Sequence, residues 1–285
     1  MDTSVEIVID DKMNTKGQRM LEGMRDAAKA LGIRTVATKH YTGKCDILMI
    51  YGFGSPIKKP WFDAHIASGG ISIGWDLGYF GRQDSRSYPM RLTINAEHPQ
   101  KLLWHNTDES RWARFGKPLR NDFNPNGHIV LCGMGRKSRW QYGYNGTDWE
   151  TKALNNIQRS FPGARIIYRP KHGATELLKC VKVDANSPIE SVIRGARMVV
   201  VHHSNVAVDA CIAGVPVVCS DGAAAALYGA DICNPINPTD AERVRFLSAL
   251  AWWQWRPEES KDCWRHILSV STSALERKGT TDGSR

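Results

Sequence analysis

The sequence predicts an α/β protein built from two Rossmann-like domains. Short apolar runs rich in β-branched residues alternate with amphipathic helical segments, which is the order of parallel strands joined by crossover helices. The chain has 285 residues, enough for two modest domains. Residues 104–127 are rich in charge, proline and asparagine, a composition typical of an interdomain linker.

The first half of the chain shows the alternation clearly. Strands are predicted over residues 5–9, 35–38, 46–51 and 70–75, and helices over residues 16–31 and 61–68. The first of these helices places Met20, Met24 and Leu31 on one face and ends at Gly32. We therefore expect a parallel sheet with its functional groups at the carboxyl ends of the strands.

A polar and aromatic stretch, Trp75–Pro99, follows the last of these strands and holds more functional groups than a connection requires. Asp76 stands at a strand end, where α/β enzymes carry reactive groups. We expect a general base here, with Asp76 as first choice and His98 as second. Arg82 and Arg91 are candidate acceptor contacts. The alternative is that Asp76 caps a turn and that His98 is structural.

The second half repeats the pattern. Strands are predicted over residues 128–132, 164–168, 181–184, 198–201 and 217–219, and helices over residues 148–161, 188–194, 206–213, 240–255 and 257–268. Domain boundaries are expected at 1–118 and 119–250, with a C-terminal helix over 251–272 and a disordered tail over 273–285.

The segment Met198–Asp221 is the part of the chain around which the second half is organised. A buried strand leads into a polar corner, His202–Asn205, and a short helix of small residues then ends at Gly214. A helix that begins at the carboxyl edge of a sheet points its first backbone N–H groups out of that edge. Such an edge binds phosphate.

This corner carries a family resemblance. The HSN sequence, the helix with its single acid and the AGVPVV that follows resemble the nucleotide-sugar half of GT-B glycosyltransferases, especially those that build capsule polysaccharide, over residues 129–229. The resemblance implies that His203, Ser204 and Asn205 hold the donor diphosphate and that Asp209 contacts the donor ribose. The alternative is that Ser204 caps a helix and Asp209 is a solvated acid of the first turn.

Two further strand ends join this expected donor site. By the same resemblance, Gly133 and Gly135, after the strand 128–132, face the donor phosphates. The RPK sequence at Arg169–Lys171 is similar to a motif of the capsule-type transferases whose cations face the donor. Such cations would neutralise a diphosphate leaving group without a metal, and the alternative is a basic surface turn. With no DxD motif in the sequence, we expect a metal-independent enzyme whose co-substrate is a nucleotide sugar such as a UDP-sugar.

The resemblance also predicts the overall arrangement. GT-B enzymes have two Rossmann-like domains facing a cleft, and their terminal helices cross back to the first domain. We therefore expect the donor on the second domain, the acceptor on the first, and the C-terminal helix packed on the first. Four tryptophans within residues 252–264 would then pack between the two domains and hold them together.

Positive charge is concentrated in one region of a basic chain. Lysine and arginine outnumber aspartate and glutamate by 38 to 29, giving a formal charge of +9. Around one acid, Asp122, residues 111–140 hold these cations: Arg111, Arg114, Lys117, Arg120, Arg136, Lys137 and Arg139. This charge favours a polyanionic partner. The alternative is that the positive charge keeps the protein soluble and lines a pocket for an anionic donor.

Residues 136–146 interleave basic and aromatic side chains between glycines and are expected to form a mobile loop. Arg136, Lys137, Arg139 and Trp140 are the candidate acceptor or DNA contacts in it, because cations and rings suit phosphate contact and base stacking. A loop that closes over the nucleotide donor is the alternative.

A second resemblance bears on the acceptor. Residues 75–99 are also similar to a segment of uncharacterised bacteriophage proteins of the form D-x-GY, then R, then RxxxN and HP. With the basic charge, this favours hydroxymethylated bases in double-stranded phage DNA, which would have to be flipped out of the duplex. One alternative is a transferase for a cell-envelope or capsule glycan. Another is a non-catalytic DNA-binding protein on a GT-B scaffold.

Several features exclude other classes of protein. No apolar run is long enough to span a bilayer, and the acidic N-terminus does not resemble a signal peptide. We therefore expect a cytoplasmic protein without a membrane partner, in the host cytoplasm if it is phage-encoded. The cysteines and histidines lack zinc-site spacing, so no structural metal is expected.

Overall fold

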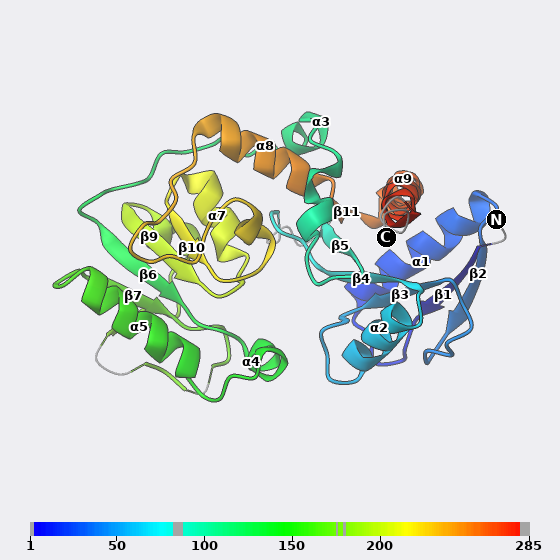
Figure 1. Cartoon of the computed structure of the whole chain (residues 1–285), viewed down its shortest axis with the longest axis horizontal. Coiled ribbons are helices and arrows are strands. Elements are labelled where there is room, and N and C mark those ends of the chain that lie inside the picture. The colour runs from blue at the N-terminus through cyan, green and yellow to red at the C-terminus, as the bar shows by residue number, and fades with distance from the viewer. Residues whose placement is uncertain (1–2, 82–87, 175, 179–180, 280–285) are drawn as a thin grey trace. The chain divides into compact units, whose positions relative to one another are not determined.

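The computed structural model describes residues 3–81, 88–174, 176–178 and 181–279 (Figure 1). The chain divides into two compact units. Unit 1 comprises Met1–Asn106 with Trp252–Arg285, and unit 2 comprises Thr107–Ala251. The first boundary precedes the expected one at residue 118, because the short helix α3 (Ser110–Ala113) packs against α8 (Asp240–Ala251) of unit 2.

Unit 1 is built on a six-stranded sheet in the order β11-β5-β4-β3-β1-β2. Its strands are β1 (Ser4–Val8), β2 (Arg34–Thr38), β3 (Ile47–Tyr51), β4 (Ile71–Leu77), β5 (Met90–Ile94) and β11 (Gln254–Trp255). Its helices are α1 (Thr15–Ala30), α2 (Lys58–Ala67) and α9 (Ser260–Gly279), with 3-10 turns over Gln100–His105 and Pro257–Glu259. Strands β1 to β4 are parallel, whereas β5 and β11 run antiparallel to their neighbours.

Strand β5 is an element that the sequence analysis missed, since it treated the whole stretch after Trp75 as irregular. Met90, Leu92 and Ile94 are buried and alternate with Arg91 and Thr93, a period-2 pattern concealed among polar neighbours. The antiparallel register places Arg91 directly opposite Asp76 of β4. The missed strand therefore determines which side chain Asp76 meets.

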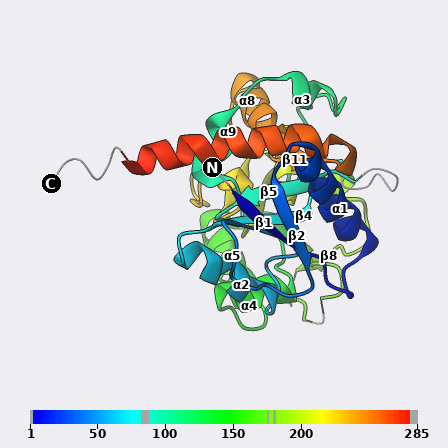
Figure 2. The same cartoon turned by 90° about the vertical axis from the view of Figure 1, so that its right-hand side faces the viewer.

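The predicted return of the C-terminal segment to the first unit is confirmed. Strand β11 pairs with β5, and helix α9 packs alongside α1 (Figure 2). The Trp264 indole N–H donates to the Met24 carbonyl at 2.7 Å, and Trp253, Trp255 and Trp264 are all buried within this unit.

Two predicted helix boundaries near the C-terminus were wrong. The helix expected over 240–255 ends at Ala251, because Gln254 forms part of β11 and its amide oxygen accepts from the Tyr79 backbone N–H at 2.7 Å. Helix α9 continues to Gly279, into the tail expected to be disordered from residue 273, since the sequence ALERK has high helix propensity. Residues 280–285 of that tail lie outside the described residues.

Unit 2 is built on a sheet of five parallel strands in the order β10-β9-β6-β7-β8. These are β6 (His128–Cys132), β7 (Ile166–Arg169), β8 (Lys182–Val183), β9 (Ala196–Val201) and β10 (Val217–Cys219). The helices not yet given are α4 (Arg136–Tyr142), α5 (Asp148–Ser160), α6 (Ile189–Ile193) and α7 (Val206–Ala213), with a 3-10 turn over Ala223–Ala226.

Helices cover both faces of this second sheet. Ile129 and Leu131 of β6 share a core cluster with Trp149 and Ile157 of α5. Helix α7 packs on β9 and β10, and Figure 1 shows α5 and α7 on opposite sides of the sheet. Burial on both faces explains why these strands are continuous apolar runs. Because the strands are parallel, their carboxyl ends meet at one edge, which we call the carboxyl edge of the second sheet.

Helix α4 replaces the mobile loop that the sequence predicted over residues 136–146. It ends at Gly143, whose φ of 71° is the left-handed conformation of a helix C-cap. Ser138, Arg139 and Tyr142 each bind a group elsewhere in unit 2, as described below. These tertiary contacts order a segment that its composition alone did not mark as helical.

Candidate functional site

The ends of β6 and β7 bring four of the predicted donor residues together. The Gly133 backbone N–H donates to the Arg169 carbonyl at 2.9 Å. A Cβ atom at Gly133 would lie 2.6 Å from the Tyr168 hydroxyl, so this position has no room for a side chain. A Cβ atom at Gly135 would lie 3.4 Å from Cγ of Lys171. The glycine loop after β6 therefore lies against the basic end of β7.

A buried carboxylate supports this loop from beneath. Glu150 of α5 has no exposed surface, and its Oε1 accepts from the Met134 N–H at 2.8 Å and from Nη2 of Arg139 at 2.6 Å. Arg139, predicted as an acceptor contact, is thus turned inward, with 12% of its side chain exposed. Glu150 was not predicted as a site residue, because an acid in the first turn of a helix is usually solvated and nothing local marks it as buried.

The interior beside Glu150 contains polar atoms whose hydrogen bonding is incomplete. Among the described residues, Glu150 Oε2 and the Tyr168 hydroxyl have no hydrogen-bond partner. Burial, and then the neighbouring Glu150 charge, raise the pKa of Tyr168 to about 12. The hydroxyl therefore stays protonated near neutral pH and can donate a hydrogen bond.

The polar corner after β9 is held by α4. Nε2 of His203 lies 2.9 Å from the Ser138 hydroxyl, and its Nδ1 lies 3.1 Å from Nδ1 of His202. The Tyr142 ring packs 4.4 Å from the His202 ring, and the Tyr142 hydroxyl donates to Asp221 Oδ2 at 2.6 Å. Helix α4 is therefore fastened to the ends of both β9 and β10. Asp221 was not among the predicted site residues. It follows a predicted strand, and it could have been found because α/β proteins place functional groups at the carboxyl ends of strands.

The corner continues into α7 at the same edge. The Ser204 hydroxyl accepts from the Val206 N–H at 3.3 Å, a contact of the turn that leads into α7, whereas the N-cap residue of α7 is Asn205. Asp209 lies in the first turn of α7. Burial raises the pKa of the Cys132 thiol, at the end of β6, to about 12, with smaller effects from the charges of the β7 cations and Asp209.

The two cations after β7 have different environments. Nη1 of Arg169 donates to the Asp184 carbonyl at 3.0 Å and lies 3.4 Å from its Oδ1. Lys171 is exposed, and within the described residues it has no ion-pair partner. Lys171 is therefore available to a ligand, whereas Arg169 is oriented by an acid.

The exposed face of α4 carries the remaining predicted acceptor contacts of this unit. Arg136 and Lys137 are exposed, and 52% of the Trp140 surface is accessible. Arg139, on the same helix, is separated from this set by its bond to Glu150. We call Arg136, Lys137 and Trp140 the α4 surface.

The basic region expected over residues 111–140 is less exposed than its composition indicated. Arg111 is buried and donates to the Ala251 carbonyl at 3.2 Å. Arg120 pairs with Asp122 at 2.9 Å. Counting charges along the sequence overstated the field available to a polyanion, because internal arginines cannot be told from surface ones in this way.

Unit 1 brings both predicted general bases to a single arginine. Nη2 of Arg91 donates to Asp76 Oδ2 at 3.2 Å, and Nη1 of Arg91 lies 3.4 Å from Nδ1 of His98. The hydroxyl of buried Tyr79 is also 3.4 Å from that nitrogen. The Leu77 N–H donates to Asp76 Oδ1 at 2.8 Å. Arg82, the other predicted acceptor contact, lies outside the described residues.

The two candidate bases differ in exposure. The Asp76 side chain is 30% exposed, whereas His98 is 2% exposed. A guanidinium can only donate hydrogen bonds, so Nδ1 of His98 faces Arg91 as an acceptor. A substrate can therefore reach Asp76, and His98 is placed to orient Arg91.

Other polar side chains of unit 1 were missed. Lys58 pairs with Asp10 at 2.5 Å and donates to the Tyr51 carbonyl at 3.0 Å. The Asn14 amide donates to the Tyr51 hydroxyl at 3.1 Å. These groups lie at the end of β1 or β3, or follow those strands in the chain. Because α/β proteins place functional groups at the carboxyl ends of strands, these residues could have been included among the candidate acceptor residues.

The fold is that of GT-B-like glycosyltransferases. The beta Kdo 2,7 transferase of KpsC from Thermosulfurimonas dismutans has a TM-score of 0.52 and 16% identity, covering 91% of this chain and 97% of that chain. The beta Kdo 2,4 transferase of KpsC from the same organism has a TM-score of 0.53 and 12% identity, covering 92% and 95%. No protein-family model and no curated protein matches the sequence. The resemblance to bacteriophage proteins stays a prediction.

Among the described residues, no helix has both the length and the hydropathy needed to cross a membrane. Nor do three or more histidine, cysteine, aspartate or glutamate side chains gather there as ligands for a metal ion. Metal independence and a cytoplasmic location stay predictions.

Proposed function

We propose that the chain is a glycosyltransferase whose nucleotide-sugar donor binds at the carboxyl edge of the second sheet. The observation that carries this proposal is the gathering of three strand ends at that edge. They supply a glycine loop at Gly133–Gly135, a free cation at Lys171 and the polar corner His203–Asn205. The GT-B-like fold supports the same conclusion.

The chemistry follows from where charge develops. When the bond between sugar and nucleotide breaks, negative charge accumulates on the departing phosphate. The ammonium of Lys171 and the positive end of the α7 dipole would stabilise it. In unit 1, the Asp76 carboxylate, oriented by Arg91, would take the proton of the acceptor hydroxyl as its oxygen attacks the anomeric carbon.

Nucleotide binding tests the donor site. A panel of uridine and cytidine mono- and diphosphates should contain a nucleotide that raises the melting temperature, because binding to the native state alone stabilises it by about 2.7 kcal/mol at a hundred times Kd. We expect UDP to act. The shift should vanish when Arg169→Ala and Lys171→Ala are combined, and persist in Lys152→Ala, which removes an exposed cation of α5. A flat response to every nucleotide and nucleotide sugar would eliminate this donor site.

For the acceptor, we propose hydroxymethylated bases of double-stranded DNA. The α4 surface supports this, because it presents two cations beside an exposed indole, and such groups contact phosphates and stack on bases. A capsule or cell-envelope glycan is the alternative acceptor. A DNA-binding protein without catalysis is distinguished from both by the absence of nucleotide binding.

Salt dependence tests the nucleic-acid acceptor. Affinity for a duplex should fall log-linearly with salt, by roughly a hundredfold or more between about 50 and 200 mM. Replacing Arg136 and Lys137 by serine should reduce the slope by up to about two contacts, while Lys152→Ser leaves it unchanged. Duplexes with and without hydroxymethylated bases would be compared. If no binding is detected even at low salt, DNA is excluded as the acceptor, and the glycan is then the acceptor.

A further inference from the structure

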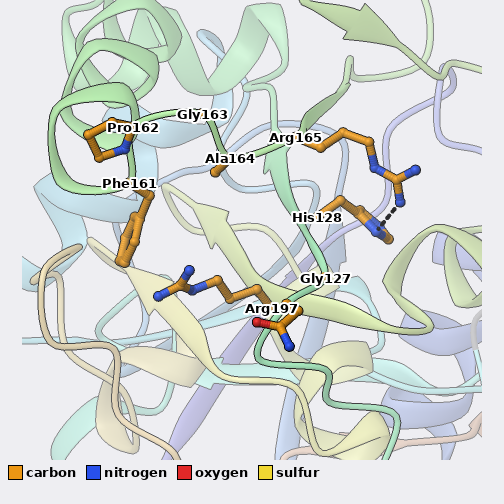
Figure 3. A pocket seen from close by; sticks show the side chains of 9 residues that line it. Gly127, His128, Phe161, Pro162, Gly163, Ala164, Arg165 and Arg197 are labelled. Carbon is orange, nitrogen blue, oxygen red and sulfur yellow. Dashed lines mark hydrogen bonds between the residues drawn. The ribbon is translucent and has the colours of Figure 1, made fainter.

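A pocket of about 410 Å³ lies at the opposite edge of the second sheet, where the strands begin. His128 is the first residue of β6, Arg165 precedes β7, and Arg197 belongs to the start of β9. Gly127 and Gly163 line the pocket without side chains (Figure 3). Because the sheet is parallel, this edge is separate from the carboxyl edge to which we assign the donor.

Neutral groups hold both arginines of this pocket. Nη2 of Arg165 lies 3.1 Å from Nδ1 of His128, and Nε2 of His128 lies 2.7 Å from the Val192 carbonyl. A carbonyl only accepts, so Nε2 carries the proton and Nδ1 accepts from Arg165, which makes His128 neutral. Arg197 lies over the Phe161 ring, 4.3 Å from its centroid. Figure 3 shows the two guanidiniums directed towards these two different partners.

The charge of these two arginines is therefore not balanced by a neighbouring acid, in contrast to that of other arginines of unit 2. Four of those pair with acids: Arg120 with Asp122, Arg139 with Glu150, Arg169 with Asp184 and Arg243 with Asp240. Within the described residues, neither Arg165 nor Arg197 has such a partner. The carboxyl end of α5, near Phe161, supplies only about half a negative charge, which does not balance two cations.

We infer that this pocket is a second ligand site, and that it binds a phosphate group carried by a small molecule. A phosphate monoester has nearly two negative charges at neutral pH, which matches the two guanidiniums better than a single carboxylate does. The planar donors of arginine suit phosphate oxygens. The volume is that of a small-molecule site.

Inorganic phosphate is the first probe, compared with acetate and chloride at equal ionic strength. It should raise the melting temperature of the wild type saturably, and Arg165→Gln and Arg197→Gln should each weaken the apparent affinity at least tenfold. Arg165 is exposed, so its replacement leaves the fold intact. Lys152→Gln, the matched loss of a charge outside the pocket, should keep the full response.

Measurements on further variants distinguish this site from the donor site. The part of the phosphate response that depends on Arg165 and Arg197 should persist in Lys171→Ala, and Arg165→Gln should keep the nucleotide response. An equal effect of acetate, or an equal loss in Lys152→Gln, would reduce the observation to general ion binding and overturn the inference. Displacement of phosphate by a short DNA duplex would overturn the assignment to a small molecule.

Discussion

The carboxyl edges of the two sheets carry different kinds of groups. In unit 2 the edge presents glycines, a free cation at Lys171 and the N-terminus of α7, and Glu150 supports its glycine loop from the interior. In unit 1 the edge presents the partly exposed carboxylate of Asp76, oriented by Arg91 in front of the buried His98. The first set is suited to bind an anion and the second to move a proton. Binding and proton transfer should therefore be separable by mutation.

The largest expected effect comes from Asp76→Asn. This change keeps the shape of the side chain and removes its basicity, so sugar transfer should fall by about 10²- to 10⁴-fold. The nucleotide-dependent rise in melting temperature should stay, because the groups proposed to bind the donor lie in unit 2. Asp26→Asn, which alters an exposed acid of α1, is the control and should leave transfer rates unchanged. Full activity of Asp76→Asn would remove this residue from the mechanism.

Removing the acid beneath the glycine loop should mainly affect stability. Glu150→Ala leaves Arg139 largely buried without its counter-charge, so the free energy of unfolding should fall by about 3–5 kcal/mol. Urea unfolding measures this loss. Combining it with Arg139→Met should recover much of it, since no uncompensated charge then stays inside. If Glu150→Ala costs under about 1 kcal/mol, the carboxylate does not support the loop as described.

His98→Gln should have a smaller effect on transfer than Asp76→Asn. His98 orients Arg91 without reaching solvent, so we expect a loss of roughly tenfold in kcat from misplaced groups, with little change in KM. The pH profile of kcat should keep its shape, because a positioning residue does not titrate in the rate-limiting proton transfer. A lost limb in that profile would instead identify His98 as the base.

The sequence was sufficient for the strands of unit 2 and for the edge at which they end. Strands β6, β7, β9 and β10 are buried on both faces, so they are continuous apolar runs, and parallel order then places Gly133, Arg169 and Ser204 at one edge. Strand β5 was missed because its inward residues alternate with polar ones inside a polar stretch. Local pattern identifies such a strand poorly, since its pairing with β4 and β11 decides it.

The side-chain partners could not be predicted. Whether Arg139 faces solvent depends on a buried acid eleven positions further on, at Glu150, and no local signal marks that acid as internal. Helix α4 is ordered by contacts of Ser138 and Tyr142 with His203 and Asp221, which are distant in sequence. Such contacts override intrinsic propensity.

The smallest predicted effect is the pH dependence of the free energy of unfolding. Burial lowers the pKa of His202 below its ordinary value of 6.5, although the Asp221 and Glu150 charges oppose this. The unfolded chain therefore binds more protons just below pH 6.5, so stability should fall as the pH is lowered through that region, by at most about 1.4 kcal/mol per pH unit for one proton. His202→Phe keeps a ring at this position and should flatten the dependence. An unchanged slope in that variant would assign the effect to another group.

The most direct test of the central claim measures two quantities on two variants. Nucleotide affinity and the rate of sugar transfer would be compared between wild type, Asp76→Asn and the Arg169→Ala, Lys171→Ala pair. We predict that Asp76→Asn loses transfer at unchanged nucleotide affinity. The paired variant should lose nucleotide affinity, and its transfer should be impaired in proportion at low donor concentration. Loss of nucleotide affinity in Asp76→Asn, or retention of affinity in the paired variant, would contradict the division between a donor site on unit 2 and a proton acceptor on unit 1.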